Sequence, residues 1–250
     1  MTMPNQTRRD AICLLGMAAV GGSLALALPK ALRAQTSAEV PKVLATSLVR
    51  TAPTVWNDRA CLAVELKDEV QARIVATRSG GNGPSYAIVA RDFVDGVIEV
   101  DVGGELTHKG GADARGFVGV AFHVIPERNI FEAFYLRMAN GRLNAPLPPA
   151  PRIDRAIQYA AHPDFHYNVS RAQFPGRYER GADVALGRWH RLRVEIEGRR
   201  ARALVDGNEA LVVEGLHYGG QGGAVGLFID DGSRGFFHGL SVRNAPSHAA

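Results

Sequence analysis

Polar and apolar residues alternate through the last quarter of this chain. The segment HRLRVEIE (190–197) has a charged residue at every odd-numbered position, and apolar residues occupy three of its four even-numbered positions. A period of two sends successive side chains to opposite faces, which is typical of a half-buried β-strand. Gly198 and Gly207 follow as turn signals and separate this strand from the next two. The region therefore predicts a meander of antiparallel strands.

Short strand segments separated by turn residues also fill most of the chain after residue 60. Glycine-rich clusters such as SGGNGP (79–84) and GGQGG (219–223) mark the turns. No long amphipathic helix interrupts the series, so the sequence predicts an all-β domain of two packed antiparallel sheets. The expected strands are Cys61–Leu66, Gln71–Thr77, Tyr86–Ala90, Phe93–Val102, Phe117–Val124, Phe131–Met138, Trp189–Glu197, Ala201–Asp206, Ala210–Glu214, Ala224–Ile229 and Phe236–Arg243.

Several of these segments carry recognisable motifs, namely GRWHRLRVEIEG (187–198), LVDG (204–207), GGAVGLFI (222–229), FFHGLSVRN (236–244) and, upstream, FVDGVIEVDV (93–102). Together they resemble the concanavalin A-like lectin and glucanase superfamily in its laminin-G-like branch, which implies a jelly-roll sandwich over about residues 85–244. FVGVAFHV (117–124) and FEAFYLR (131–137) further resemble the bacterial 3-keto-disaccharide hydrolase group. That resemblance implies cleavage of glycosidic bonds in oxidised sugars.

Residues 1–34 are identified as an export signal that precedes the folded domain. Arg8 and Arg9 come before an apolar run rich in Ala and Gly (11–28), and ALRA (31–34) offers a small-residue cleavage site. TRRD (7–10) resembles a twin-arginine signal, but Ala11 stands where such signals carry a large apolar residue, so general secretory export stays open. A retained membrane anchor is the alternative, which the glycines of the run disfavour. The expected location is periplasmic or secreted.

Removal of this signal changes what the charge implies. The whole chain has a net charge of +4, and residues 1–34 contain four basic residues and one acidic residue, so +1 remains. This balance gives no support for binding to nucleic acid or to an acidic membrane surface. Cys13 leaves with the signal, so Cys61 has no partner for an intramolecular disulfide.

The remaining chain is expected to form a leader or edge segment (35–60) and one sandwich domain (61–245). Residues 139–181 do not fit a meander, because a proline cluster is followed by a stretch dense in Arg, His, Tyr, Asn, Gln and Asp. Such side chains hydrogen-bond hydroxyl groups or stack on sugar rings, and a loop of this length is often functional. A ligand is therefore expected at this excursion, unless it only covers a sheet edge. Its candidate substrate-binding residues are Gln158, Tyr159, Asp164 and Arg171.

A possible metal site lies in the same excursion. HPDFH (162–166) places His162, Asp164 and His166 at alternate positions, so an extended loop would point all three the same way. Imidazole and carboxylate at this spacing could bind a divalent metal such as zinc or manganese, or they could hydrogen-bond a sugar. The laminin-G-like resemblance similarly implies Ca²⁺ at Asp230 and Asp231, with a solvated turn as the alternative. No other cofactor is expected.

Two central strands carry further candidates. His123 shares a strand face with two small residues, opposite the apolar face, which would leave room for a ligand against the sheet. In FEAFYLR, Glu132 lies on one face, whereas Tyr135 and Arg137 lie on the other, so only one of these sets can line a cleft.

Glu99, Asp101 and Glu105 invite comparison with the paired carboxylates of retaining glucanases on the same fold. The two glutamates lie six positions apart, so an extended chain separates their Cα atoms by about 20 Å. Retaining chemistry needs carboxyl groups only about 5 Å apart. These residues are therefore interpreted as a solvated strand face.

Three functions follow from these observations. A hydrolase acting on 3-keto-glycosides needs a general base, for which His123 and His162 are the candidates. It also needs an electrophile at the ketone, which Arg137, Arg171 or a metal would supply. A carbohydrate-binding module without turnover explains the missing carboxylate pair with fewer assumptions, and a protein-interaction domain would have no pocket. The expected partner is a carbohydrate, with no stable membrane insertion once the signal is removed.

Overall fold

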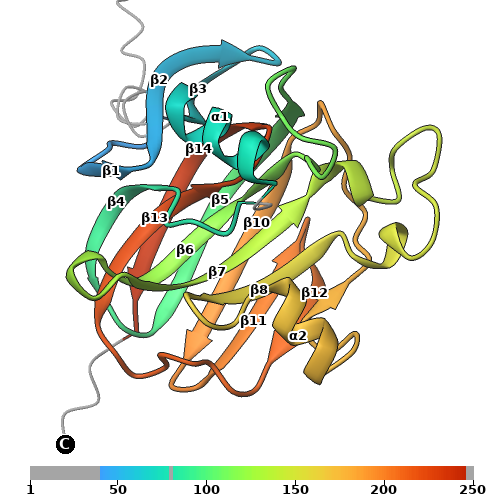
Figure 1. Cartoon of the computed structure of the whole chain (residues 1–250). Coiled ribbons are helices and arrows are strands. Elements are labelled where there is room, and N and C mark those ends of the chain that lie inside the picture. The colour runs from blue at the N-terminus through green and yellow to red at the C-terminus, as the bar shows by residue number, and fades with distance from the viewer. Residues whose placement is uncertain (1–39, 79–80, 246–250) are drawn as a thin grey trace, which may run out of the picture. The chain divides into compact units, whose positions relative to one another are not determined.

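The alternating segments form two antiparallel sheets that pack face to face. The computed structural model describes residues 40–78 and 81–245, and these residues contain two seven-stranded sheets, here called sheet A and sheet B (Figure 1). In spatial order, sheet A consists of β1 (Ala45–Ser47), β4 (Tyr86–Phe93), β13 (Gly223–Ile229), β6 (Phe117–Ile125), β7 (Ile130–Arg137), β8 (Ile157–His162) and β9 (Glu179–Arg180). Sheet B consists of β12 (Asn208–Val213), β11 (Arg200–Val205), β10 (His190–Glu197), β5 (Gly96–Leu106), β14 (Ser233–Asn244), β3 (Arg59–Leu66) and β2 (Val49–Trp56). The predicted fold class, an all-β antiparallel jelly-roll sandwich, is confirmed.

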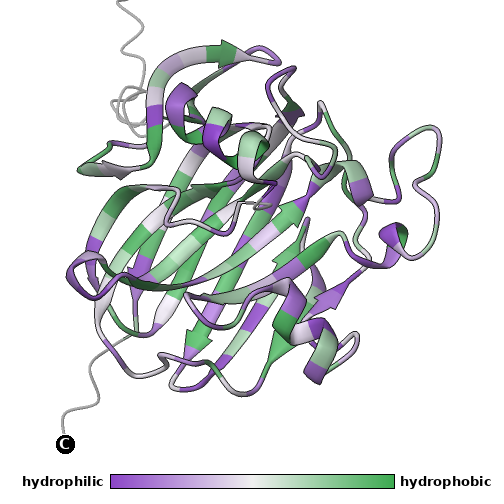
Figure 2. Cartoon of the chain, viewed as in Figure 1, coloured by the Kyte–Doolittle hydropathy of each residue, from purple (hydrophilic) through white to green (hydrophobic). Residues whose placement is uncertain are grey.

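The main core lies between the sheets, because the apolar side of each strand faces inward. Val100 of β5 pairs with Leu192 of β10, and both side chains are fully buried. Glu99 and Asp101 of β5 point outward, where both form ion pairs with Arg191. The sequence predicts this position for the two carboxylates, on the solvent-facing side of their strand. In Figure 2, hydrophobic colouring runs along central strands such as β6 and β7, whereas hydrophilic colouring is frequent in the loops.

The outer face of sheet A is apolar too, and residues 81–85 lie against one end of it. The backbone N–H of Asn82 donates to the Asp230 carboxyl just after β13 (2.9 Å), and the Ser85 hydroxyl donates to the carbonyl of Ile229 (2.6 Å). These two bonds fix residues 81–85 beside the end of β13, at the end of the outer face where β6 begins and β7 ends. The buried residues of this second core are Tyr86, Ile88, Phe117, Ala121, Val124, Phe131, Ala133, Tyr135, Ala160, Ala224 and Phe228.

The prediction of a strand at Gln71–Thr77 is wrong, since these residues belong to helix α1 (Asp68–Thr77). Asp68 and the following Glu69 place negative charge in the first turn, which favours the helix N-terminus. Val70 and Ile74 lie one turn apart on the buried side. The four-residue spacing of buried residues therefore favours a helix in this segment, although short runs within it alternate as in a strand.

The excursion at 139–181 contains regular structure that its local sequence pattern does not predict. It holds β8, the helix α2 (Tyr167–Gln173) and β9, and β8 pairs with β7 from Leu136 to Phe131. Every residue of β8 is buried, so its sequence, IQYAAH, does not alternate and resembles a loop. The leader segment likewise supplies the edge strands β1 and β2. Short 3-10 turns lie at Pro126–Arg128, Met138–Asn140 and Arg152–Asp154. Within the described residues, no helix is long and apolar enough to cross a membrane; the predicted signal at 1–34 lies outside them.

Candidate functional site

A polar pocket opens on the outer face of sheet A, where β6 begins and β7 ends. Its volume is about 200 Å³. The floor comes from β6 and β7, and the walls come from residues 81–85, the β5–β6 loop, the excursion, α2 and the residue after β13. Segments far apart in the sequence thus meet at one point. The lining residues are Asn82, Asp113, Arg115, Phe117, Tyr135, Arg137, Asn140, Arg152, Arg155, Tyr167, Arg171 and Asp230.

Arg137 is the most deeply placed charge in this pocket. Its side chain is 5% exposed, and its guanidinium donates to the Gln158 side-chain oxygen (2.5 Å) and to the Tyr135 hydroxyl (3.2 Å). The Gln158 amide in turn donates to the hydroxyl of Ser170 in α2 (3.3 Å). Burial lowers the pKa of Arg137, yet an arginine stays charged at any physiological pH. The pocket floor therefore presents a fixed, buried positive charge.

Glu179 of β9 holds the arginines on one side of the pocket. Its carboxylate, 5% exposed, accepts a bidentate pair of hydrogen bonds from Arg171 and lies 3.2 Å from Nε of Arg155. An oxygen of the same carboxylate lies 3.7 Å from Nη1 of Arg137. One buried carboxylate thus positions three guanidinium groups, and this network orders the excursion against the sheet.

Arg115 and Arg152 line the other side of the pocket, where fewer carboxylates offset their positive charges. Arg115 is bonded to the carbonyls of Ala112 and Ala114, and its nearest carboxylate, Asp113, lies 3.6 Å away and is 87% exposed. Arg152 donates to the side-chain oxygen of Asn140, and no carboxylate in residues 40–78 or 81–245 lies within ion-pair distance of it. Burial, together with the positive charges of Arg152 and Arg137, lowers the pKa of Arg115. The arginines on this side therefore repel one another.

Asp230 is the one buried carboxyl group among the lining residues. Burial raises its pKa to about 7, although the backbone N–H groups of Asn82 and Asp231 donate to it and oppose the shift. Gly81 packs so closely on this carboxyl that a side chain at that position would collide with it. Asp230 therefore changes its charge near neutral pH, as a general acid or base must.

Aromatic rings complete the lining. Phe117 and Tyr135 form part of the floor, and the guanidinium of Arg137 lies 5.9 Å and 5.2 Å from their ring centroids. Tyr167 of α2 is only half-buried, and the guanidinium of Arg171 stacks 4.9 Å from its ring. Flat apolar surfaces beside many hydrogen-bond donors suit a ligand with both hydroxyl groups and C–H faces.

The sequence candidates divide into those at the pocket and those elsewhere. Tyr135, Arg137 and Arg171 line it, and Gln158 supports Arg137 from β8. Arg115, Arg152 and Arg155 were not singled out from the sequence, because nothing in their local context distinguishes them from surface arginines. Asp230 was considered only as part of a Ca²⁺ site or a turn.

His123, Glu132 and Tyr159 lie together, but inside the sandwich and away from the pocket. All three are fully buried: Glu132 bonds Nδ1 of His123 (2.6 Å) and accepts a hydrogen bond from the Tyr159 hydroxyl (2.5 Å) and from the backbone N–H of His217 (2.8 Å). The expected outward face for His123 is wrong, since a bulge with a positive φ of 49° at this residue turns its ring inward. Its Nε2 lies 2.8 Å from the carbonyl oxygen of Val94.

His162 and His166 lie at the far end of β8 from the pocket. Their rings are in contact, with Nδ1 of His162 3.2 Å from Nε2 of His166, whereas Asp164 is exposed. Burial lowers the pKa of His162, and burial with the neighbouring His162 lowers that of His166 to about 4. Among the described residues, no three His, Cys, Asp or Glu side chains are arranged to bind a metal ion. The three side chains of HPDFH therefore do not form the metal cluster considered above.

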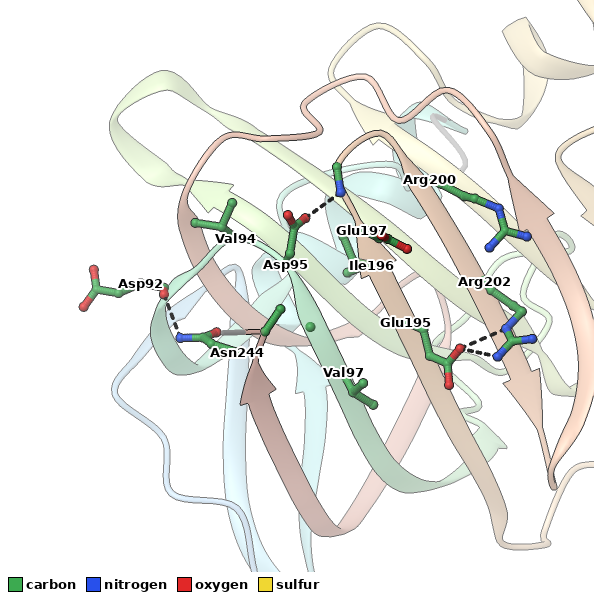
Figure 3. Close-up of a pocket in the computed structure, with 13 residues that line it drawn as sticks. Asp92, Val94, Asp95, Val97, Glu195, Ile196, Glu197, Arg200, Arg202 and Asn244 are labelled. Carbon is green, nitrogen blue, oxygen red and sulfur yellow. Dashed lines mark hydrogen bonds and ion pairs between the residues drawn. The ribbon is translucent and has the colours of Figure 1, made fainter. Parts of the chain in front are cut away.

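A larger, shallow groove lies at the end of sheet B, between the start of β5 and the β10–β11 turn (Figure 3). Its volume is about 1050 Å³. Its polar groups already satisfy one another: Glu195 pairs with Arg202, and Asp95 accepts from the backbone N–H of Gly198. The groove ends at Ala245, the last described residue. We therefore place the candidate site at the smaller, arginine-lined pocket.

No protein-family model and no curated protein matches this chain. Among solved structures, it is similar to the carbohydrate-binding module CBM66 from Bacillus subtilis, with 12% identity, 78% of this chain and 94% of that one covered, and a TM-score of 0.48. The galectin LEC-6 of Caenorhabditis elegans shows 10% identity, with 64% and 91% covered and a TM-score of 0.37. The carbohydrate recognition domain of Emp47p shows 8% identity, with 81% and 92% covered and a TM-score of 0.40. Values this low carry no weight for a function, and the resemblance to 3-keto-disaccharide hydrolases stays a prediction.

Proposed function

We propose that this chain is a lectin-like carbohydrate-binding domain whose ligand enters the pocket on the outer face of sheet A. The observation that carries this proposal is the convergence of guanidinium and amide donors with the half-buried ring of Tyr167 in one small cavity. Sugars present hydroxyl oxygens to such donors and C–H faces to such rings. A volume of about 200 Å³ is below the usual range for drug-sized ligands, about 300–1,000 Å³. The pocket therefore suits one sugar ring.

Tyr167→Ala tests this proposal with little risk to the fold, because the ring is only half-buried. We expect the full-length chain to bind a subset of a glycan array, and Tyr167→Ala to weaken that binding about tenfold by calorimetry, the loss of one ring contact. The matched control is Phe174→Ala, which removes an exposed ring next to α2 that does not line the pocket. If no glycan binds, or if both variants lose affinity equally, the pocket is not a sugar site.

Hydrolysis of 3-keto-glycosides is the second candidate, and Asp230 favours it. A ketone at C3 acidifies the hydrogen on C2, so a base can remove that proton while the aglycone leaves C1 and takes up a proton. Water then adds to the resulting double bond. A carboxyl group with a pKa of about 7 in the same pocket as Arg137 supplies a base and a positive charge for the developing enolate.

Incubation of the chain with a 3-keto-glucoside, with and without added divalent metal, tests the hydrolase proposal. We expect release of the aglycone by the unmodified chain and a loss of at least about 100-fold in Asp230→Asn, the usual contribution of a general base. Glycan binding in the absence of any release would leave the carbohydrate-binding proposal intact and remove the catalytic one.

A further inference from the structure

The charges around the pocket do not balance. Five arginines line it, and the carboxyl groups near them are Glu179, the lining residues Asp113 and Asp230, and Asp231, which lies behind the lining and acts on Arg115 at longer range. Glu179 serves the side formed by Arg137, Arg155 and Arg171, as described above. On the side of Arg115 and Arg152 the only ion-pair partner within the described ranges is the exposed Asp113, which water screens.

Contacts within the fold hold these arginines close together. Arg115 is held by the carbonyls of the β5–β6 loop, and Arg152 is held by Asn140. Both are partly buried, and the positive charges of Arg152 and of the almost fully buried Arg137 both act on Arg115. Holding like charges close together in a partly desolvated cavity is unfavourable unless an anion joins them. Three guanidinium groups from three separate segments therefore line a space whose own carboxyl groups are the exposed Asp113 and Asp230, which is neutral below about pH 7.

We propose that the sugar bound in this pocket carries an acidic substituent, held by Arg115, Arg137 and Arg152. This inference rests on the proposed carbohydrate-binding function and specifies its ligand class. The planar fork of a guanidinium matches the two oxygens of a carboxylate and also those of a sulfate group. Uronic acid residues and sulfated sugars both present such an oxyanion beside hydroxyl groups.

Asp230 makes the affinity for an acidic sugar dependent on pH. The groups facing it are Arg137 and Tyr135 from β7, Asn82 from residues 81–85, and its neighbour Asp231. Below about pH 7 its carboxyl is neutral, and above that pH it adds a negative charge that competes with the ligand for Arg137. Affinity is therefore expected to fall as the pH rises from 6 to 8, and Asp230→Asn is expected to remove this decline.

The test compares acidic probes with neutral counterparts on the full-length chain by calorimetry. Oligogalacturonate is paired with its carboxyl-reduced form, and dextran sulfate is paired with dextran, so the two arms separate carboxylate from sulfate. We expect at least one acidic probe to bind about tenfold more tightly than its partner, with affinity falling as salt is added. Arg115→Gln and Arg152→Gln should each weaken that binding about tenfold. The control Arg200→Gln, at the far groove, should leave it unchanged.

The possible results separate the acidic-ligand inference from the proposed carbohydrate-binding function. Equal binding of acidic and neutral probes would overturn the acidic-ligand inference and keep the carbohydrate-binding function. Equal losses in Arg152→Gln and Arg200→Gln would show unspecific attraction and would also overturn it. Binding of no glycan at all would overturn the proposed function itself. Circular dichroism and thermal unfolding check that each variant is folded, and Arg115→Lys retains the charge if Arg115→Gln does not fold.

Discussion

Glu132→Ala is expected to lower the free energy of unfolding by about 3–5 kcal/mol, because several buried hydrogen-bonding groups lose their partner at about 1–3 kcal/mol each. Glu132 is fully buried and bonds His123, the Tyr159 hydroxyl and the backbone N–H of His217. Without the carboxylate, these groups stay in the interior with no acceptor. Urea unfolding followed by circular dichroism measures the loss.

The matched comparison for this prediction uses two variants. Glu132→Gln keeps an acceptor oxygen and should cost less than Glu132→Ala, whereas Glu209→Ala, at an exposed site on β12, should change little. If Glu132→Ala proves as mild as Glu209→Ala, the hydrogen bonds of Glu132 contribute little to the stability of the fold.

Glu179→Ala is expected to destabilise the chain by a similar amount, about 3–5 kcal/mol. Its carboxylate is the buried partner of Arg171, Arg155 and Arg137. Without this carboxylate, the positive charges of the three arginines repel one another. Thermal unfolding at low and high salt measures the effect, because added anions should restore part of the lost stability.

Glu214→Ala is the control for Glu179→Ala, since Glu214 is exposed and pairs with one exposed arginine, Arg200. It should unfold like the unmodified chain. A loss in Glu179→Ala that is no larger, or that salt does not reduce, would contradict the assignment of Glu179 as the central counter-charge of the pocket.

Strand alternation predicted strands such as β10, because one face of that strand is buried and the other is partly exposed. The strands at Trp189–Glu197 and Phe117–Val124 correspond closely to β10 and β6. β6 and β7 are also buried on both faces, but their runs of β-branched and aromatic residues still predict strands. The prediction fails at β8, whose fully buried sequence IQYAAH has little of this composition, and at α1, where a helical spacing coexists with short alternation. Both wrong predictions concern segments whose structure depends on contacts with distant parts of the chain, which a local sequence pattern does not reveal.

The site was less predictable than the fold. Alternation in FEAFYLR placed Tyr135 and Arg137 on one face and Glu132 on the other, and this division is the observed one. A single bulge reversed the face expected for His123. Arg115 and Arg152 come from segments separated by more than one strand, so only the completed topology brings them together.

The small volume of the pocket, about 200 Å³, limits the shape of the sugar ligand proposed for it. Asn82, which is bonded to Asp230, closes the pocket on the side of β13. A polysaccharide would therefore enter by its terminus or by a short branch. Affinity counted per chain end should accordingly stay constant as the polymer is lengthened.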